Sequence, residues 1–158
     1  MSDADRTRAL KLWVVLTRAQ MAVAEHTRAD VQRSGLSPVE FAALEALHHK
    51  GPMLLGELQE KVLISSGGMT YVVDQLARKG YAERRPCTSD RRARYAALTP
   101  QGEALMESIF PRHAGVVERA VAGLTGEEQE QAIELLRKLG HTAAGQAIRS
   151  AGEDLGEG

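Results

Sequence analysis

Apolar residues recur at three- and four-residue spacing through most of this chain, the periodicity of helices with one buried face. The first such run covers about residues 4–33 and stops at Gly35. A second run, over 38–50, begins at Ser37-Pro38-Val39-Glu40, which offers a capping serine, a proline for the first turn and a glutamate that can complete a capping box. Both segments are therefore predicted to be helices.

The pattern changes in the centre of the chain. Short helices are predicted over 54–62 and 65–79, with Gly80 ending the second, and short strands over 81–85 and 94–98. A turn rich in Pro, Ser, Thr and Asp separates the two strands. Two helices followed by a β-hairpin form a winged helix-turn-helix, which places its second helix in a DNA major groove and the hairpin beside it.

The last third of the chain again has a helical pattern. Thr99-Pro100 opens one helix, and Pro111 is expected to kink it. Thr125 with Glu128 forms a second capping box before the last helix, and the tail over 150–158 is Gly-rich, acidic and expected to be disordered. The chain is therefore predicted to be mainly α, with about six helices and a small wing of two or three strands.

Composition narrows the class of protein. The chain has 158 residues, of which 43% are hydrophobic, enough for one core. Its one cysteine, Cys87, excludes an intramolecular disulfide framework and fits a reducing compartment. No apolar run approaches the roughly 20 residues that span a bilayer, and the polar N-terminus lacks a signal-peptide core, so we expect a cytoplasmic protein without membrane contact.

Charge is unevenly distributed although the net charge is only −1. Seven basic residues lie between positions 78 and 94, opposed by Glu83 and Asp90, whereas residues 99–158 hold ten acidic and five basic residues. A basic patch on an otherwise acidic chain indicates a polyanionic partner. The alternative is a solvated, charged hairpin with no partner.

The predicted second helix and wing supply the candidate DNA contacts. The small residues at the start of the helix permit close approach to a phosphate strand, its outward face can reach base edges, and an arginine at the wing tip can enter the minor groove. Asp90 is expected to pair with one arginine and hold the loop, although it is alternatively an ordinary turn residue, and the helix glycines alternatively serve packing only. The candidates are Ser65, Ser66, Gly67, Thr70, Tyr71, Gln75, Arg78, Lys79, Asp90, Arg91, Arg92 and Arg94.

These residues lie in segments that resemble the MarR family of bacterial transcription regulators. The matching segments are LSPVEFAALEAL, LLGELQEKVLISSGGMTYVVDQLARKGYAERR and SDRRARYAALTPQGEAL. The Asp-x-Arg wing followed by Leu-Thr-x-x-Gly is the most specific element, and the sequence from Ser65 onward resembles the branch that regulates quinone and hydroquinone resistance. With its helical flanks, the resemblance covers about residues 5–145.

The resemblance implies a homodimer that reads a pseudo-palindromic operator on double-stranded DNA, most commonly as a repressor. It assigns residues 1–35 to an N-terminal dimerisation helix, 36–98 to the DNA-binding lobe and 99–149 to C-terminal dimerisation helices. It also implies that Ser66, Gly67, Thr70, Tyr71 and Gln75 contact DNA from the helix, and that Arg91 and Arg92 contact it from the wing, steadied by Asp90.

Many relatives bind small aromatic acids or phenols between the dimerisation helices and the winged lobe. The candidates for such a ligand site are Trp13, Arg18, Met21, His48 and Met53, and the alternative for Trp13 and Met21 is an ordinary core or interface role. Cys87 is a candidate thiol sensor because nearby arginines favour a thiolate, and the alternative is an inert wing thiol. The five histidines are scattered without close-spaced ligand pairs, so no metal or other cofactor is assigned.

Three function classes follow. A ligand-responsive or thiol-responsive DNA-binding repressor is the main hypothesis. A winged-helix protein-interaction module without DNA readout and a zinc-responsive regulator are the alternatives. An enzyme is not expected, because the sequence shows no nucleophile–base signature, no zinc-protease motif and no phosphate-binding loop.

Overall fold

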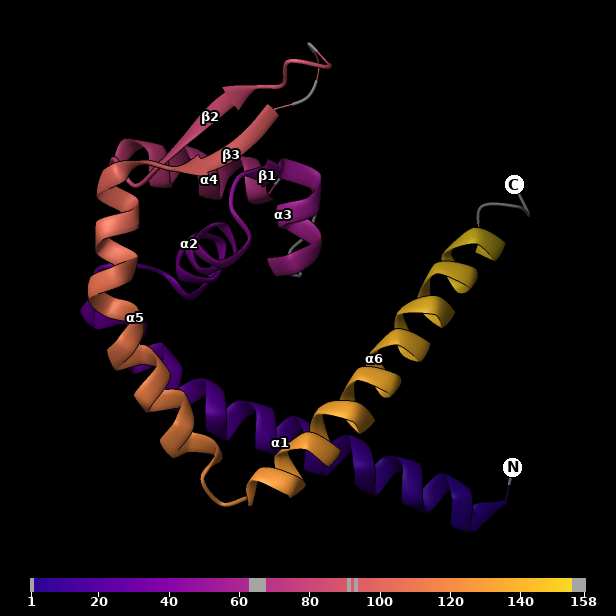
Figure 1. Ribbon diagram of the computed structural model, residues 1–158. Helices are drawn as coiled ribbons and strands as arrows, with labels where there is room; N and C mark the ends of the chain where they lie inside the picture. The colour runs from indigo at the N-terminus through magenta and orange to yellow at the C-terminus, as the bar shows by residue number, and fades with distance from the viewer. Residues whose placement is uncertain (1, 63–67, 91, 93, 155–158) are drawn as a thin grey trace. The chain divides into compact units, whose positions relative to one another are not determined.

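The computed structural model describes residues 2–62, 68–90, 92 and 94–154, with side-chain exposure described up to Gly145. Within these residues the chain forms six helices and one three-stranded sheet, which confirms the predicted mainly α fold with a small wing (Figure 1). Residues 1–118 form one compact unit and 119–158 a second. The elements are α1 (Asp3–Arg33), α2 (Pro38–Lys50), β1 (Met53–Leu54), α3 (Leu55–Val62), α4 (Gly68–Arg78), β2 (Ala82–Pro86), β3 (Arg94–Leu98), α5 (Pro100–Val121) and α6 (Gly126–Asp154).

The sheet is antiparallel, with strand order β1-β3-β2. The wing strands pair from Ala82 with Leu98 to Pro86 with Arg94. β1 pairs Met53 with Ala96 and turns the hairpin into a three-stranded sheet. The sequence pattern predicts no strand at Met53, because two residues are too short to show an alternation. Only their pairing with β3 defines this strand.

The core of the first unit is built mainly from aliphatic side chains of α2, α3, α4 and α5. Phe41 is the one buried Phe, Tyr or Trp among the residues whose exposure is described. Burying such side chains stabilises the fold by about 1.5–3 kcal/mol each, so this core anchors the helices that carry the wing. The largest fully buried side chains are Leu44, Leu58, Met69, Val73, Leu76 and Met106.

Local signals predicted the helix ends well. Ser37 and Glu40 form the expected capping box of α2, and Thr125 and Glu128 form the expected pair before α6. A further capping box at Ser2, which starts α1, was missed. α5 remains helical through Pro111, and α6 stays helical to Asp154, beyond the start of the tail expected at 150, because Ser150, Ala151 and Glu153 tolerate a helix.

Helix α4 ends in a Schellman motif around Gly80. The amide of Gly80 bonds the carbonyl of Ala77 over 3.0 Å, and the amide of Tyr81 bonds that of Leu76 over 2.9 Å. Gly80 has φ +81°, a left-handed conformation that side chains with a β-carbon rarely adopt. This motif turns the chain directly from α4 into the wing.

The start of α5 is fastened to this same turn. Thr99 donates from Oγ1 to the Gly80 carbonyl over 2.6 Å and accepts from the Gly102 amide over 3.0 Å. The sequence motif Leu-Thr-x-x-Gly therefore joins the wing, the end of α4 and the first turn of α5 at one place. None of the described helices is long and apolar enough to cross a membrane.

Candidate DNA-binding site

Helix α4 has one buried face and one solvent face, as predicted. Met69, Val72, Val73 and Leu76 are buried, which fixes the orientation of the helix on the core. On the opposite face, Thr70, Tyr71 and Arg78 are exposed and Gln75 is half-buried, with the Tyr71 side chain 65% exposed. A polar, exposed face on a well-anchored helix is the arrangement that base readout requires.

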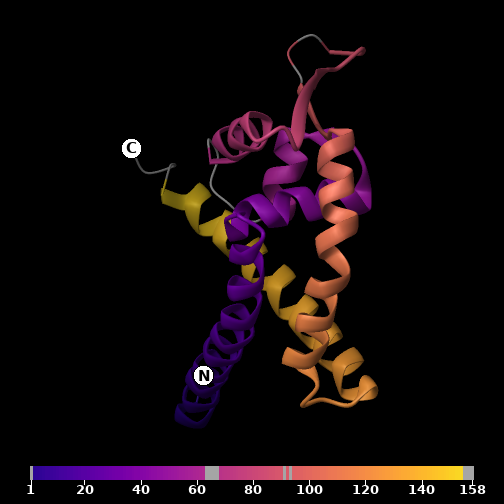
Figure 2. The ribbon, with the colours of Figure 1, turned by 90° about the vertical axis from the view of Figure 1, so that its left-hand side faces the viewer.

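The wing projects beside this helix (Figure 2). Arg84 on β2 donates from Nη2 to Oδ1 of Asp74 over 2.7 Å and to the Thr70 carbonyl over 3.3 Å. This ion pair holds the first wing strand against α4. It was not predicted, because ten residues separate the partners and no helical or strand spacing relates them.

At the wing tip, Asp90 accepts a hydrogen bond from the backbone amide of Arg92 over 2.9 Å. This is an Asx turn, in which a carboxylate replaces a backbone acceptor and fixes the loop. The sequence predicted that Asp90 holds the loop through an arginine side chain, whereas the bond described is to backbone. Arg92 and Arg94 are exposed. Ser65, Ser66, Gly67 and Arg91 lie outside the described residues.

Lys79, predicted to contact phosphates, has its ammonium bound to two groups of the same lobe. Nζ donates to Oε2 of Glu40 over 2.8 Å and to the Gly35 carbonyl over 3.1 Å. The Lys79 side chain is still 36% exposed. It differs from its exposed neighbour Arg78 in these two contacts, not in its burial.

Cys87 follows β2 at the base of the wing loop and is only 9% exposed. Its Sγ lies 3.1 Å from Oγ of Ser89. Hydrogen bonds from the Ser89 side chain and backbone lower the pKa of the Cys87 thiol, and the charge of the resulting thiolate raises the pKa of Tyr95. The thiol therefore ionises more readily than a free cysteine, which favours nucleophilic chemistry.

A separate cavity of about 340 Å³ lies between α1, α2 and α5. Its volume is within the range of small-molecule sites. Phe41 and His113 form an aromatic wall, with ring centroids 4.3 Å apart, and several polar groups surround it. The lining residues are Gln20, Ala24, Thr27, Arg28, Val31, Pro38, Phe41, Glu45 and His113.

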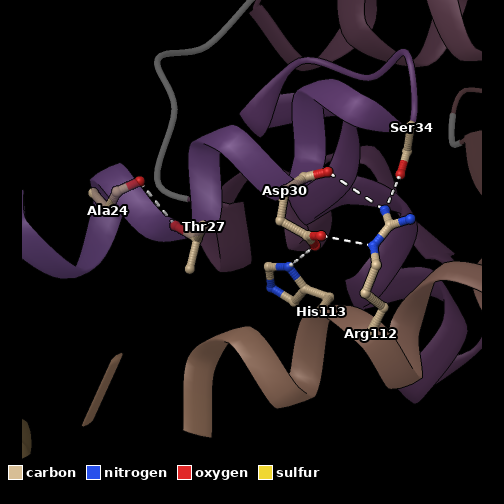
Figure 3. Close-up of polar contacts among 6 residues, drawn as sticks. All are labelled: Ala24, Thr27, Asp30, Ser34, Arg112 and His113. Atoms are coloured by element: carbon tan, nitrogen blue, oxygen red, sulfur yellow. Dashed lines mark hydrogen bonds and ion pairs between the residues drawn. The ribbon is translucent and has the colours of Figure 1, made fainter. Parts of the chain in front are cut away.

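His113, which lines this cavity, also belongs to a polar cluster centred on the buried Asp30 (Figure 3). Asp30, 4% exposed, lies on α1 and takes one partner on each oxygen. Oδ1 accepts from Nε of Arg112 over 2.7 Å, and Oδ2 lies 3.1 Å from Nδ1 of His113. Arg112 also donates to Oγ of Ser34 over 2.9 Å. The cluster thus joins α5 to the last turn of α1.

The five ligand candidates from the sequence do not line this cavity together. Trp13, Arg18 and Met21 are exposed on α1. His48 lies on α2, where its Nδ1 is 2.6 Å from Oε1 of Glu103, and the buried Met53 borders a different, charged groove. The sequence missed Phe41, Glu45 and His113 as cavity residues because they come from two helices far apart in sequence. Within the described part of the chain, no group of three His, Cys, Asp or Glu side chains could hold a metal ion.

Known proteins share both the sequence and this geometry. The MarR family model matches residues 36–93. The regulator MhqR of Bacillus subtilis is 39% identical over 136 residues, covering 86% of this chain and 94% of MhqR. The structure of Sco3205 from Streptomyces coelicolor, a MarR family regulator in complex with DNA, is 25% identical with a TM-score of 0.78, covering 86% of this chain and 88% of Sco3205.

A further solved relative is BpsR of Bordetella bronchiseptica, whose DNA binding is regulated by 6-hydroxynicotinic acid. It is 27% identical with a TM-score of 0.72, covering 82% of this chain and 98% of BpsR. The likeness to MhqR covers 86% of this chain and therefore extends over both units. This chain therefore belongs to the MarR family of DNA-binding transcriptional regulators, which are not enzymes.

Proposed function

We propose that this chain is a homodimeric repressor that releases a pseudo-palindromic operator when a small aromatic or phenolic compound fills the α1–α2–α5 cavity. The observation that carries this proposal is the cavity itself. It places an aromatic wall and hydrogen-bonding groups between α1 and the DNA-binding lobe, where an occupant touches both. An occupant that moves the DNA-binding lobe relative to α1 would change the distance between the two lobes of the dimer on DNA.

The exposed apolar face of α1 supports a second copy of this chain as partner. Leu10, Trp13, Val14 and Met21 recur at helical spacing and are between 42% and 65% exposed. Burying such an apolar stripe against a partner would stabilise the protein by several kcal/mol relative to leaving it in water. α6 likewise exposes Ile133, Leu135, Leu136 and Leu139. We assign both surfaces to the dimer, and expect Trp13→Glu to give monomers in analytical ultracentrifugation.

Operator contact is assigned to the exposed face of α4 and to the wing. Thr70, Tyr71 and Gln75 would read bases, while Arg78, Arg92 and Arg94 would approach phosphates or the minor groove. Ser65, Ser66, Gly67 and Arg91 keep the same assignment from the family motif. Asp90 would act indirectly, by fixing the loop that carries Arg92.

The DNA assignment is tested by titrating operator fragments from the gene's own upstream region at several salt concentrations. Arg92→Ala should weaken binding across sequences and reduce the salt slope by about 1, because one phosphate contact is lost. Unchanged affinity and slope would remove Arg92 from the interface. If the parent protein bound no duplex even at low salt, a protein-interaction module would be the better description.

The cavity lining indicates the class of ligand. Phe41 and His113 can flank a flat ring, while Gln20, Thr27, Arg28 and Glu45 offer donors and acceptors around its edge. This suits hydroxylated aromatics better than aliphatic compounds. Regulation of BpsR by 6-hydroxynicotinic acid, a hydroxylated aromatic acid, supports the same class in this chain.

The ligand assignment is tested with a panel of hydroquinone, phenols, aromatic acids and zinc, measured by thermal shift and by operator release. Ala24→Leu should fill the cavity and abolish both responses while leaving operator binding intact. Ala29→Leu, an exposed change on the same helix, is the matched control. Stabilisation by zinc alone would favour a metal-responsive regulator.

Thiol modification at Cys87 is a second candidate mechanism, favoured by its lowered pKa. Because Cys87 lies at the base of the wing loop, alkylation would displace the segment that carries Arg92. Operator release by a quinone that Cys87→Ala abolishes but Ala24→Leu does not would assign the response to the thiol.

A further inference from the structure

Lys79 lies immediately after the last residue of the recognition helix, and its side chain turns back to the rest of the lobe. Its ammonium contacts Oε2 of Glu40 over 2.8 Å and the Gly35 carbonyl over 3.1 Å. Glu40 is only 8% exposed, and the same Oε2 also accepts the Ser37 amide over 2.9 Å. The end of α4 is therefore tied to the turn between α1 and α2.

Arg112 holds the same turn from α5. It donates to Oγ of Ser34 over 2.9 Å and to Oδ1 of Asp30 over 2.7 Å (Figure 3). Ser34 and Gly35 are consecutive residues. Lys79, just after α4, and Arg112, on α5, thus hold neighbouring positions of one short turn.

The alternative role for Lys79 is a phosphate contact. To reach a phosphate, Lys79 would have to leave Glu40, and the nearly buried carboxylate would lose its cation. Leaving a buried charge without its partner is strongly unfavourable. The geometry therefore favours a role within the lobe over a contact to DNA.

The contacts of Arg112 also lead to the cavity between α1, α2 and α5. His113 lines the cavity and shares the Asp30 carboxylate with Arg112, each taking one oxygen. A displacement of His113 would therefore act on the same carboxylate that Arg112 binds. Contacts are thus continuous from the cavity wall to the last turn of α4.

We propose that Lys79 is a positioning residue of the recognition helix, and that Lys79 and Arg112 act as one coupled unit through the Ser34–Gly35 turn. The unit sets the position of the end of α4. The link to ligand control rests on the proposed function of the cavity, whereas the coupling between the two cations does not.

The first test separates positioning from phosphate contact. Lys79→Met should lower operator affinity about tenfold while leaving the salt slope unchanged, since no phosphate contact is lost. Glu40→Gln removes the ion pair but preserves the capping box and the charge of Lys79. It should weaken operator binding as Lys79→Met does. Lys50→Met, an exposed lysine of the same lobe, is the charge-matched control.

A slope reduced by about 1 in Lys79→Met, together with undiminished binding by Glu40→Gln, would make Lys79 a phosphate ligand and overturn the proposal. These outcomes differ from failure of the proposed function, in which the parent itself would bind no operator.

The second test needs no DNA. Amide hydrogen exchange is measured at Lys79, Gly80 and Tyr81, whose amides bond back into α4. Arg112→Met, on a different helix, removes the hydrogen bonds to both Ser34 and Asp30. It should speed exchange at these three amides at least about tenfold, the lower end of what loss of a hydrogen bond to a charged group implies. The double variant with Lys79→Met should exchange little faster than Arg112→Met alone, because either substitution already breaks the coupled unit.

Ser34→Ala deletes only the Ser34 acceptor of Arg112 and keeps the ion pair to Asp30, so it provides a milder variant if Arg112→Met folds poorly. Arg137→Met, an exposed arginine of α6, is the control. Unchanged exchange at Lys79, Gly80 and Tyr81 in both Arg112→Met and Ser34→Ala, or fully additive effects in the double variant, would overturn the coupling.

Discussion

Arg84 on β2 and Asp74 on α4 form an ion pair of 2.7 Å that joins the wing to the recognition helix. Both side chains are partly exposed, at 33% and 46%. The pair therefore contributes little to the free energy of unfolding, under about 1 kcal/mol. Its role is to fix the position of the wing relative to α4, the two elements proposed to contact DNA.

Asp74→Asn should separate specific from non-specific DNA binding. The variant gains one net positive charge, so binding to random duplex should become tighter. The operator needs the wing and α4 in register, so the ratio of operator to random-duplex affinity should fall by roughly two- to fivefold, the range of an ion pair worth up to about 1 kcal/mol. Competition titrations at two salt concentrations measure this ratio. An unchanged ratio would mean that the pair does not position the wing.

Tyr71→Ala should weaken operator binding with little effect on folding. The side chain is 65% exposed, so the free energy of unfolding should change by less than about 0.5 kcal/mol. Loss of one base contact should lower operator affinity about tenfold, equivalent to about 1.4 kcal/mol. The salt slope should stay constant because tyrosine is uncharged. Equal losses on operator and on random duplex would indicate a backbone contact instead.

Gly102→Ala should destabilise the winged lobe. A β-carbon at Gly102 would lie 1.9 Å from the carbonyl oxygen of Tyr81, so α5 would have to move off the turn that follows α4. Overpacking of this kind costs about 1–3 kcal/mol, measurable by urea unfolding.

Gly56→Ala is the matched control for this change, because a β-carbon at that helical position meets nothing within 4 Å. It should leave stability unchanged or raise it by up to about 1 kcal/mol. If both substitutions had the same effect, close packing of α5 on Tyr81 would not explain the glycine of the Leu-Thr-x-x-Gly motif.

Ser89→Ala should slow alkylation of Cys87 near neutral pH. Hydrogen bonding from Ser89 is the leading cause of the lowered Cys87 pKa, so the parent holds more thiolate than a free cysteine. Removing the hydroxyl raises the pKa and moves the midpoint of the rate–pH profile upward. Alkylation rates of Cys87 with iodoacetamide, measured across the pH range, give this midpoint. Thr88→Ala, a change at an exposed neighbour, is the control. Identical profiles for parent and Ser89→Ala would exclude Ser89 as the cause.

Much of the architecture was predictable because its signals are local. Ser37 with Glu40 marked the start of α2, Gly80 marked the end of α4, and the spacing of Met69, Val73 and Leu76 identified the buried face of the recognition helix. Each of these signals lies within one or two helical turns, over which backbone geometry alone relates the residues. The exposed Tyr71 and the wing were located for the same reason.

The sequence by itself determined the winged fold and the solvent face of α4, since helical periodicity and capping depend on neighbours in the chain. Only the tertiary structure decided which charged residues pair across the lobe. Asp30 finds Arg112 and His113 at 82 and 83 positions away, and Lys79 finds Glu40 at 39. Such pairs have no characteristic spacing, because they form where separate helices pack. The cavity wall and the pairing of Lys79 with Glu40 therefore became visible only in three dimensions.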